Sequence, residues 1–250
     1  MTHDLNRREF LLASAALAAA TQAPATAPAP PGAGGGRRAI AKGGVVLFQG
    51  DSITDTGRNR DSADANAAGA LGNGYPLLVA SAVLADHPGL GLKCYNRGVS
   101  GNKVPDLQQR WTTDTINLKP DILSILIGVN DFWHKLDHGY NGTVQDYEQQ
   151  YDALLASTRE ALPRVRLIVL EPFVLRTGAV DARWFPEFDQ RRAVAARVAA
   201  RAKATFVPLQ TIFNQRVKSA PPEYWAADGV HPTPAGHAVI ADHWRRAANL

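Results

Sequence analysis

The chain has 250 residues, of which 45% are hydrophobic and 20% are charged, and its formal net charge is +4. This length and composition predict one globular domain with a sizeable core. The basic residues between positions 183 and 203 are spread along an alanine-rich helical pattern, which favours a solvated helix face over a nucleic-acid-binding surface. The single cysteine, Cys94, excludes an intramolecular disulfide and an all-cysteine metal site.

The N-terminal segment has the pattern of an export signal. Arg7 and Arg8 lead into a short alanine-rich run, and the whole resembles a signal read by the twin-arginine export machinery. A transmembrane helix needs about 20 apolar residues, so this shorter run predicts no stable membrane insertion. We expect a signal peptide at residues 1–20, with cleavage there or as late as residue 25, and a linker rich in Pro, Ala and Gly at 21–43. The exported domain, periplasmic or extracellular, is expected at 44–250.

Short apolar runs alternate with longer helical patterns from residue 44 onward. Strands are expected at 45–49, 93–96, 122–127, 167–170 and 206–208, and helices at 76–85, 104–111, 144–162, 187–202 and 234–248. This alternation predicts an α/β fold, in which a parallel sheet is covered by helices on both faces. Ligands bind beyond the carboxyl ends of the strands in such sheets. Residues 57–74 have no apolar period, and a loop of this length is typically functional or mobile.

The first expected strand ends in Gly50-Asp51-Ser52, and the neighbours of the serine suggest two roles for it. Ser52 followed by Asp55 three positions later fits a capping box at a helix start. A serine on a tight glycine turn after a strand also fits a nucleophile. Because Gly57 would end the capped helix after about one turn, capping alone is a weak reason for this serine.

Two further strand ends carry glycine beside polar residues. The motif Asn-Arg-Gly-Val-Ser-Gly spans 96–101, and Gly-Val-Asn-Asp spans 128–131. Glycine lets a backbone N–H approach a ligand closely, and asparagine supplies a neutral donor. Donors of this kind form an oxyanion hole, which stabilises the negative charge that develops when an acyl carbonyl is attacked.

Asp228 and His231 lie in a loop that enters the last expected helix at Thr233 and Pro234. On such a turn the carboxylate can bond one imidazole nitrogen while the other nitrogen faces a serine. The alternative is that His231 packs the turn and Asp228 makes an Asx-turn with its own backbone. Taken alone, this motif favours the structural alternative.

Four motifs in order resemble those of the GDSL or SGNH hydrolase family. They are Gly-Asp-Ser-Ile-Thr, Asn-x-Gly-x-Ser-Gly, Gly-Val-Asn-Asp and Asp-Gly-Val-His-Pro, and the likeness spans residues 45 to about 241. The resemblance implies a three-layer α/β/α sandwich whose five-stranded parallel sheet has the flavodoxin-like order 2-1-3-4-5. It also implies catalysis without a metal or an organic cofactor.

The resemblance assigns a role to each matching residue. It implies that Ser52 is the nucleophile, that His231 is the general base and that Asp228 orients the histidine. It also implies an oxyanion hole formed by the backbone N–H groups of Ser52 and Gly98 and by the side chain of Asn130. The reaction it implies is acyl transfer from an ester to the serine, followed by hydrolysis of the acyl-enzyme.

The leading functional hypothesis is an exported carbohydrate O-acetylesterase that acts on a small-molecule or polysaccharide ester. Trp133 and Trp225 lie close to catalytic motifs and are candidates for stacking on sugar rings. The segment 57–74 has few large apolar residues to line an acyl tunnel, which favours acetyl esters over long acyl chains. A lysophospholipase or short-chain lipid esterase, an acetyltransferase and a non-catalytic carbohydrate-binding protein are the alternatives. His134 and His138 are four positions apart, but the glycines that follow predict a loop there and no metal site.

Overall fold

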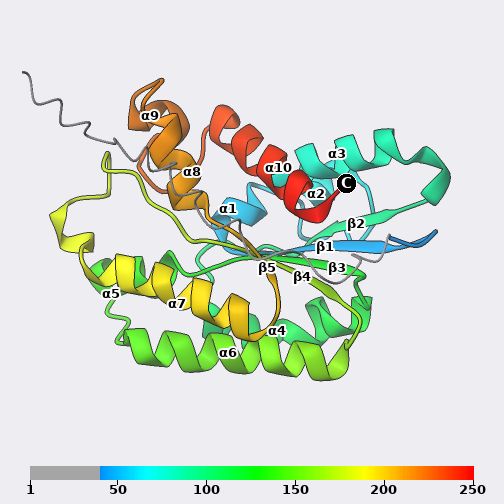
Figure 1. Cartoon of the computed structure of the whole chain (residues 1–250), viewed down its shortest axis with the longest axis horizontal. Helices are drawn as coiled ribbons and strands as arrows, with labels where there is room; N and C mark the ends of the chain where they lie inside the picture. Colours follow the sequence, from blue (N-terminus) through cyan, green and yellow to red (C-terminus); the bar gives the residue numbers. More distant parts are fainter. Residues whose placement is uncertain (1–39) are drawn as a thin grey trace, which may run out of the picture. The chain divides into compact units, whose positions relative to one another are not determined.

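A computed structural model describes residues 40–250, which form one compact unit around a central sheet. The five strands are β1 (Val45–Gly50), β2 (Lys93–Asn96), β3 (Ile122–Leu126), β4 (Arg166–Leu170) and β5 (Thr205–Val207). All neighbouring strands are parallel, and their order is β2-β1-β3-β4-β5 (Figure 1). The predicted fold class and strand order are therefore confirmed. The expected signal peptide lies outside the described residues.

Helices cover both faces of the sheet, as Figure 1 shows. The long helices are α3 (Tyr75–Asp86), α4 (Val104–Asp114), α6 (Val144–Ala161), α7 (Glu187–Arg201) and α10 (Pro234–Ala248). The shorter ones are α1 (Ser52–Asp55), α2 (Ala68–Leu71), α5 (Asn130–Asp137), α8 (Leu209–Arg216) and α9 (Pro222–Trp225), with 3-10 turns η1 (Pro88–Leu90), η2 (Ile116–Leu118) and η3 (Ala182–Trp184). No helix in this described part of the chain is both long enough and apolar enough to cross a membrane.

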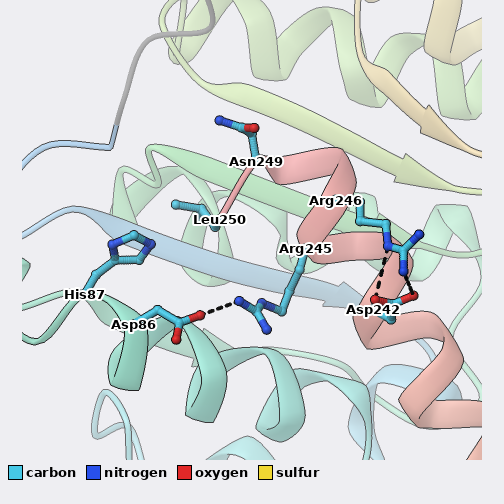
Figure 2. A pocket seen from close by; sticks show the side chains of 7 residues that line it. All are labelled: Asp86, His87, Asp242, Arg245, Arg246, Asn249 and Leu250. Carbon is cyan, nitrogen blue, oxygen red and sulfur yellow. Dashed lines mark hydrogen bonds and ion pairs between the residues drawn. The ribbon is translucent and has the colours of Figure 1, made fainter.

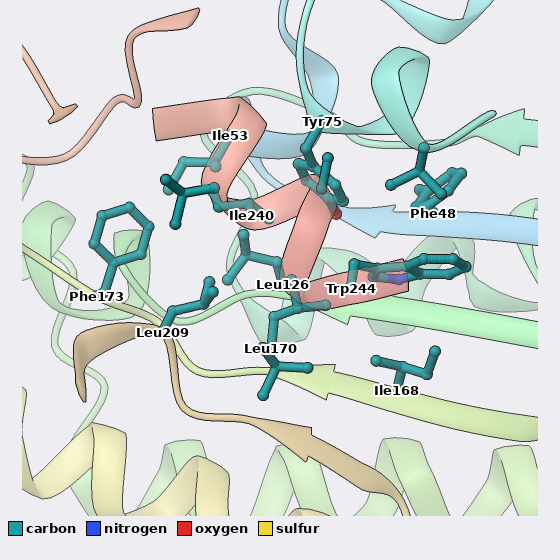
Figure 3. Packing of buried hydrophobic residues seen from close by; sticks show 14 of the residues in the cluster. Phe48, Ile53, Tyr75, Leu126, Ile168, Leu170, Phe173, Leu209, Ile240 and Trp244 are labelled. Carbon is teal, nitrogen blue, oxygen red and sulfur yellow. The ribbon is translucent and has the colours of Figure 1, made fainter. Parts of the chain in front are cut away.

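The strand side chains alternate between two cores. In β1, Val46 and Phe48 belong to the core under α3 and α10, whereas Leu47 belongs to the core under α4, α6 and α7. In Figure 3, Phe48 and Trp244 lie close together in the first core, and their ring centroids are 5.3 Å apart. The indole N–H of Trp244 donates to the hydroxyl of Ser124 on β3 over 2.9 Å, so α10 is tied to the middle of the sheet. Because both faces are covered, the carboxyl ends of the strands are left to carry polar groups.

Three local features differ from the sequence expectations. Helix α5 occupies the segment around His134 where a loop was expected, and α8 was not anticipated. The long segment 57–74 contains the short helix α2. Asn66 connects this segment to the edge strand β2, because the Asn66 side chain accepts the Cys94 N–H over 2.7 Å. Ile40, which lies four positions before the expected domain start at residue 44, is buried in the first core.

Candidate active site

Ser52 is the first residue of the one-turn helix α1, which directly follows β1. The N-cap of this helix is Asp51, whose Oδ1 accepts the Ile53 N–H over 3.0 Å. The carboxylate of Asp55 instead bonds Arg60 and the N–H and hydroxyl of Ser100, so no capping box with Ser52 forms. The capping interpretation of Ser52 is therefore wrong. Its hydroxyl is left available because the preceding residue caps the helix.

Ser52, His231 and Asp228 form one hydrogen-bonded chain. The Ser52 Oγ lies 2.8 Å from His231 Nε2, and His231 Nδ1 lies 2.6 Å from Asp228 Oδ2. The other carboxylate oxygen of Asp228 accepts the backbone N–H groups of Val230 and His231 over 2.9 and 2.7 Å. Asp228 thus makes both the Asx-type turn and the imidazole bond that the sequence left as alternatives. The arrangement matches a serine activated by a histidine that a carboxylate orients.

The two ionisable partners shift each other's pKa. Burial acts to raise the pKa of Asp228, but the bonds from the His231 ring and from two backbone N–H groups outweigh it and lower this pKa to about 2. The hydrogen bond that His231 donates to Asp228 raises the pKa of His231 above its usual 6.5, although partial burial opposes the change. Asp228 is therefore ionised near neutral pH, and it favours the protonated form of His231.

The three expected oxyanion donors lie on adjacent strand ends. The N–H of Ser52 belongs to the first turn of α1, where an N–H has no partner within the helix. Asn130 begins α5 and is 4% exposed; one hydrogen of its Nδ2 is donated to the Asn102 carbonyl over 3.2 Å, which leaves the second hydrogen for a ligand. The N–H of Gly98 donates to Asn96 Oδ1 over 2.9 Å, so a ligand at this donor shares it with Asn96.

Gly98 is fixed by its close approach to α1. A Cβ at this position would lie 2.4 Å from the backbone nitrogen of Asp55, far inside contact distance. Only glycine therefore lets the loop after β2 pack against the helix that begins at Ser52. This contact brings the motif at 96–101 to the serine.

Two fully buried carboxyl groups lie beneath the site. Burial raises the pKa of Asp51 and the pKa of Asp131 to about 7 in each case, and backbone hydrogen bonds only partly offset it. Asp131 accepts the N–H of Val104, the first residue of α4, over 3.1 Å. It therefore ties the start of α4 to α5, whose first residue is Asn130. Neither carboxyl group replaces Asp228 in its contact with the histidine ring nitrogen.

The two tryptophans proposed for substrate contact lie in different environments. Trp133 is half-buried, its ring centroid is 5.9 Å from that of His231, and it packs on the buried Trp184. Trp225 is only 9% exposed and donates its indole N–H to the Ala220 carbonyl over 3.2 Å. The structure therefore places Trp133 beside the histidine, whereas Trp225 serves the core and offers little of its ring to a sugar.

Other polar clusters lie apart from this triad. His134 on α5 and His138 just after this helix have ring centroids 4.7 Å apart, but within residues 40–250 no third histidine, cysteine or carboxylate completes a metal site. A hollow of about 500 Å³ lies at the far end of α10. Figure 2 shows the residues that line it, where Arg245 pairs with Asp86 and Arg246 pairs with Asp242. Helix α10 begins three residues after His231 and runs away from it, so this hollow is separate from the site.

Sequence reasoning missed three residues that shape the site. Asp51 caps α1, Trp184 supports the ring of Trp133, and Arg110 of α4 bonds the loops that surround Gly98. The first had a sequence signal, because an aspartate directly before a short helix is a preferred N-cap. The other two act across long sequence separations, so no local pattern could reveal them.

Comparison with known proteins gives a consistent picture. The model of the GDSL-like lipase/acylhydrolase family matches residues 48–239. An acetylxylan esterase from Geobacillus stearothermophilus is 39% identical over 204 residues, which are 81% of this chain and 92% of that protein. A solved structure named as a GDSL-like lipase from Parabacteroides merdae is 47% identical, with a TM-score of 0.82 over 84% of this chain and 98% of its own.

Solved structures of an acetylxylan esterase from Geobacillus stearothermophilus include catalytic mutants in which a serine, an aspartate or a histidine is replaced by alanine. The serine mutant is 36% identical to this chain, with a TM-score of 0.76 over 84% of this chain and 96% of its own. The family model covers most of this chain, and the acetylxylan esterase is matched over nearly its whole length. Both matches indicate the same family. The chain belongs to the GDSL-like lipase/acylhydrolase family and is a carboxylic ester hydrolase.

Proposed function

We propose that this protein is an exported carbohydrate O-acetylesterase that uses Ser52, His231 and Asp228 as its catalytic triad. The observation that carries the proposal is the continuous chain of short contacts from the Ser52 hydroxyl through the His231 ring to the Asp228 carboxylate. The catalytic serine, aspartate and histidine replaced in the solved acetylxylan esterase have the same spacing along their chain as these three residues. The curated acetylxylan esterase supports an acetyl ester of a sugar as the substrate.

The proposed reaction has two acyl-transfer steps. His231 Nε2 takes the proton of Ser52 Oγ as this oxygen bonds the ester carbonyl carbon, and the carbonyl oxygen becomes an oxyanion. The C–O bond to the sugar then breaks, and His231 gives its proton to the departing alcohol. Water repeats the sequence on the acetyl-enzyme and releases acetate. Asp228 keeps the imidazole oriented and stabilises its charged form through the bond to Nδ1.

The oxyanion is proposed to lie among the Ser52 N–H, the second Nδ2 hydrogen of Asn130 and the Gly98 N–H. Asn130 is the best prepared of these donors, because it is buried and its amide is already oriented by the bond to Asn102. A donor that is fixed before the reaction stabilises the transition state without reorganisation. The Gly98 N–H would make a three-centre bond, since Asn96 Oδ1 also accepts from it.

For substrate contact we propose Trp133 and not Trp225. The Trp133 ring lies beside His231 and is held by its indole N–H, which donates to Asp137 over 2.8 Å. A fixed aromatic ring beside the catalytic base can stack on the sugar that carries the acetyl group. Trp133→Ala is expected to reduce hydrolysis of acetylated xylan several-fold more than hydrolysis of p-nitrophenyl acetate. Trp225→Phe is the matched control, because a buried tryptophan should affect both substrates alike.

A substrate panel tests the proposed function. We expect the full-length protein to hydrolyse p-nitrophenyl acetate and acetylated xylan, and activity to fall at least about tenfold for an eight-carbon acyl chain, which corresponds to about 1.4 kcal/mol of barrier. Ser52→Ala should remove nearly all of this activity and leave the circular dichroism spectrum unchanged, because Asp51 and not Ser52 caps α1. Faster cleavage of lysophospholipids than of acetyl esters would replace the proposal with a lipid esterase. Undiminished turnover by Ser52→Ala would exclude the serine mechanism.

Export is proposed from the sequence of the first 20 residues, which lie outside the described structure. An Arg7→Lys, Arg8→Lys double variant should leave the precursor in the cytoplasm, because the arginine pair is the feature that the twin-arginine machinery reads. Cell fractionation and immunoblotting measure the effect. Unchanged export of the double variant would contradict the proposed route.

A further inference from the structure

Arg110 connects the loops that surround the proposed oxyanion hole. It lies on α4, and its side chain is only 18% exposed. Its guanidinium donates to acceptors at the end of β1, in the loop after β2 and on its own helix. They are Gln49 Oε1 at 2.9 Å, the Gly50 carbonyl at 3.4 Å, the Arg97 carbonyl at 2.8 Å, Asn102 Oδ1 at 2.8 Å and Asp114 Oδ2 at 3.0 Å. The planar guanidinium can hold several acceptors at once, whereas an ammonium has a different geometry.

The first important contact is with the peptide that carries the Gly98 N–H. The Arg97 carbonyl and the Gly98 N–H belong to the same peptide group, which is planar and trans. Fixing the direction of the carbonyl therefore fixes the opposite direction of the N–H. Arg110 holds the oxygen of this group over 2.8 Å, while Asn96 holds its hydrogen. A positive charge at the carbonyl also polarises the amide and strengthens its N–H as a donor.

The second important contact leads to Asn130. The Nε of Arg110 donates to the side chain of Asn102, and the backbone carbonyl of Asn102 accepts from Asn130 Nδ2 over 3.2 Å. Arg110 therefore holds the loop residue that orients the Asn130 amide. A third contact is with the carbonyl of Gly50, the last residue of β1, two positions before Ser52. One guanidinium is thus bonded next to all three proposed donors.

We propose that Arg110 is a positioning residue for the oxyanion hole, which acts on the Gly98 peptide through Arg97 and on Asn130 through Asn102. It does not touch the substrate. The proposal rests on the serine esterase mechanism proposed above. A purely structural role for Arg110 would affect folding stability and substrate binding without a specific effect on the transition state. The two roles therefore differ in kcat, in KM and in the binding of an oxyanion-forming inhibitor.

The chain contains a matched control in Arg159 of α6. This arginine is also partly buried and also donates its guanidinium to backbone carbonyls, including those of Ala202 at 2.9 Å and Lys203 at 3.1 Å. It also bonds the carbonyl of Val165, which lies just before β4 begins and hence at the end of the sheet opposite the site. Each substitution removes guanidinium bonds to backbone carbonyls and should therefore lower the free energy of unfolding. Arg159→Lys, however, should leave kcat for ester hydrolysis unchanged.

The experiment compares Arg110→Lys, Arg159→Lys and wild type in the full-length protein. The assays are p-nitrophenyl acetate kinetics, inhibition by a trifluoromethyl ketone whose adduct with Ser52 places an oxyanion in the hole, and thermal unfolding. We expect Arg110→Lys to lower kcat by about tenfold to a hundredfold. This decrease is smaller than the one expected when an oxyanion-hole donor is removed entirely. KM should stay within about twofold, and the inhibition constant should rise by about the same factor as kcat falls. Arg159→Lys should change neither.

Asn102→Ala provides a second variant in case Arg110→Lys fails to fold. It removes one acceptor of the guanidinium and loosens the loop that orients Asn130, so kcat should fall several-fold with KM unchanged. If kcat and the inhibition constant of the folded variants match those of Arg159→Lys, the proposal is overturned. If the wild type itself shows no serine-dependent ester hydrolysis, the underlying mechanism has failed. The two failures are therefore distinguishable.

Discussion

Acidification is expected to destabilise the protein through His237, a histidine of α10 that does not contact the triad. Its side chain is buried, and its Nδ1 accepts the N–H of Tyr75, the first residue of α3, over 3.2 Å. Burial, followed by the positive charge of His231, lowers the pKa of His237 from 6.5 to about 4. Protonation would occupy the lone pair that accepts this bond, so the folded protein holds His237 neutral.

The magnitude follows from the two pKa values. Between about pH 6.5 and about pH 4 the unfolded chain binds a proton that the folded chain does not, so the free energy of unfolding falls as the pH falls through this window. The whole shift corresponds to about 3 kcal/mol, of which about 2 kcal/mol is lost by about pH 5. Asp51 and Asp131 change the free energy of unfolding in the opposite direction. Burial raises their pKa to about 7, so the folded protein takes up these protons before the unfolded chain does and gains stability as the pH falls.

The assay is urea unfolding of wild type and His237→Asn at about pH 7.5 and about pH 5. Asparagine does not titrate, and its Oδ1 can replace Nδ1 as the acceptor for Tyr75. The contributions of Asp51 and Asp131 are common to both proteins and cancel in the difference. Between the two pH values, the free energy of unfolding of wild type should fall by about 2 kcal/mol more than that of the variant. Parallel pH dependences of the two proteins would refute the reasoning.

Three further predictions concern the triad, the oxyanion hole and the core. Asp228→Asn should lower the maximum rate and shift the acidic limb of the kcat/KM profile to lower pH, because the bond to Asp228 raises the pKa of His231, which acts as base when neutral. An unmoved limb would argue against His231 as the titrating base. Asn130→Ala should lower kcat by about 10² to 10³ with little change in KM for p-nitrophenyl acetate, and a change confined to KM would contradict its role at the transition state. Trp244→Phe removes the hydrogen bond to Ser124 and leaves space in the core, so urea unfolding should show that the free energy of unfolding falls by about 1–3 kcal/mol, with activity retained. A fall below about 0.5 kcal/mol would show that this bond contributes little.

The fold was predictable because its signals are local. Five short apolar runs became the five strands, each within one residue of its expected ends, and the five expected helices all formed. Helix α5 was missed because the glycines at 139 and 142 suggested a loop, yet they lie beyond its last residue and only terminate it. Ile40 lies in a stretch rich in Gly and Ala, so its packing into the core had no sequence signal.

The site was predictable only in part. Asp228 and His231 are three positions apart, so a turn can join them, and the glycines at strand ends mark where Ser52 and Asn130 converge. The burial of Trp225 depends on how α9 packs against α10, which its sequence neighbours do not specify. The contacts of Arg110 require the end of β1 and the loop after β2 to meet at α4, and this follows only from the three-dimensional sheet order.

Two carboxyl groups near His231 differ in environment, and this difference separates their roles. Asp228 accepts three hydrogen bonds, which lower its pKa to about 2, so its charge is constant wherever the enzyme works. Asp51 is fully buried with one cap bond, and burial raises its pKa to about 7, so its charge varies near neutrality. A constant charge suits the role proposed for Asp228, which is to stabilise the imidazolium during proton transfer. Asp51 is suited to a different task, since it can cap α1 and thereby leave the hydroxyl of Ser52 to His231.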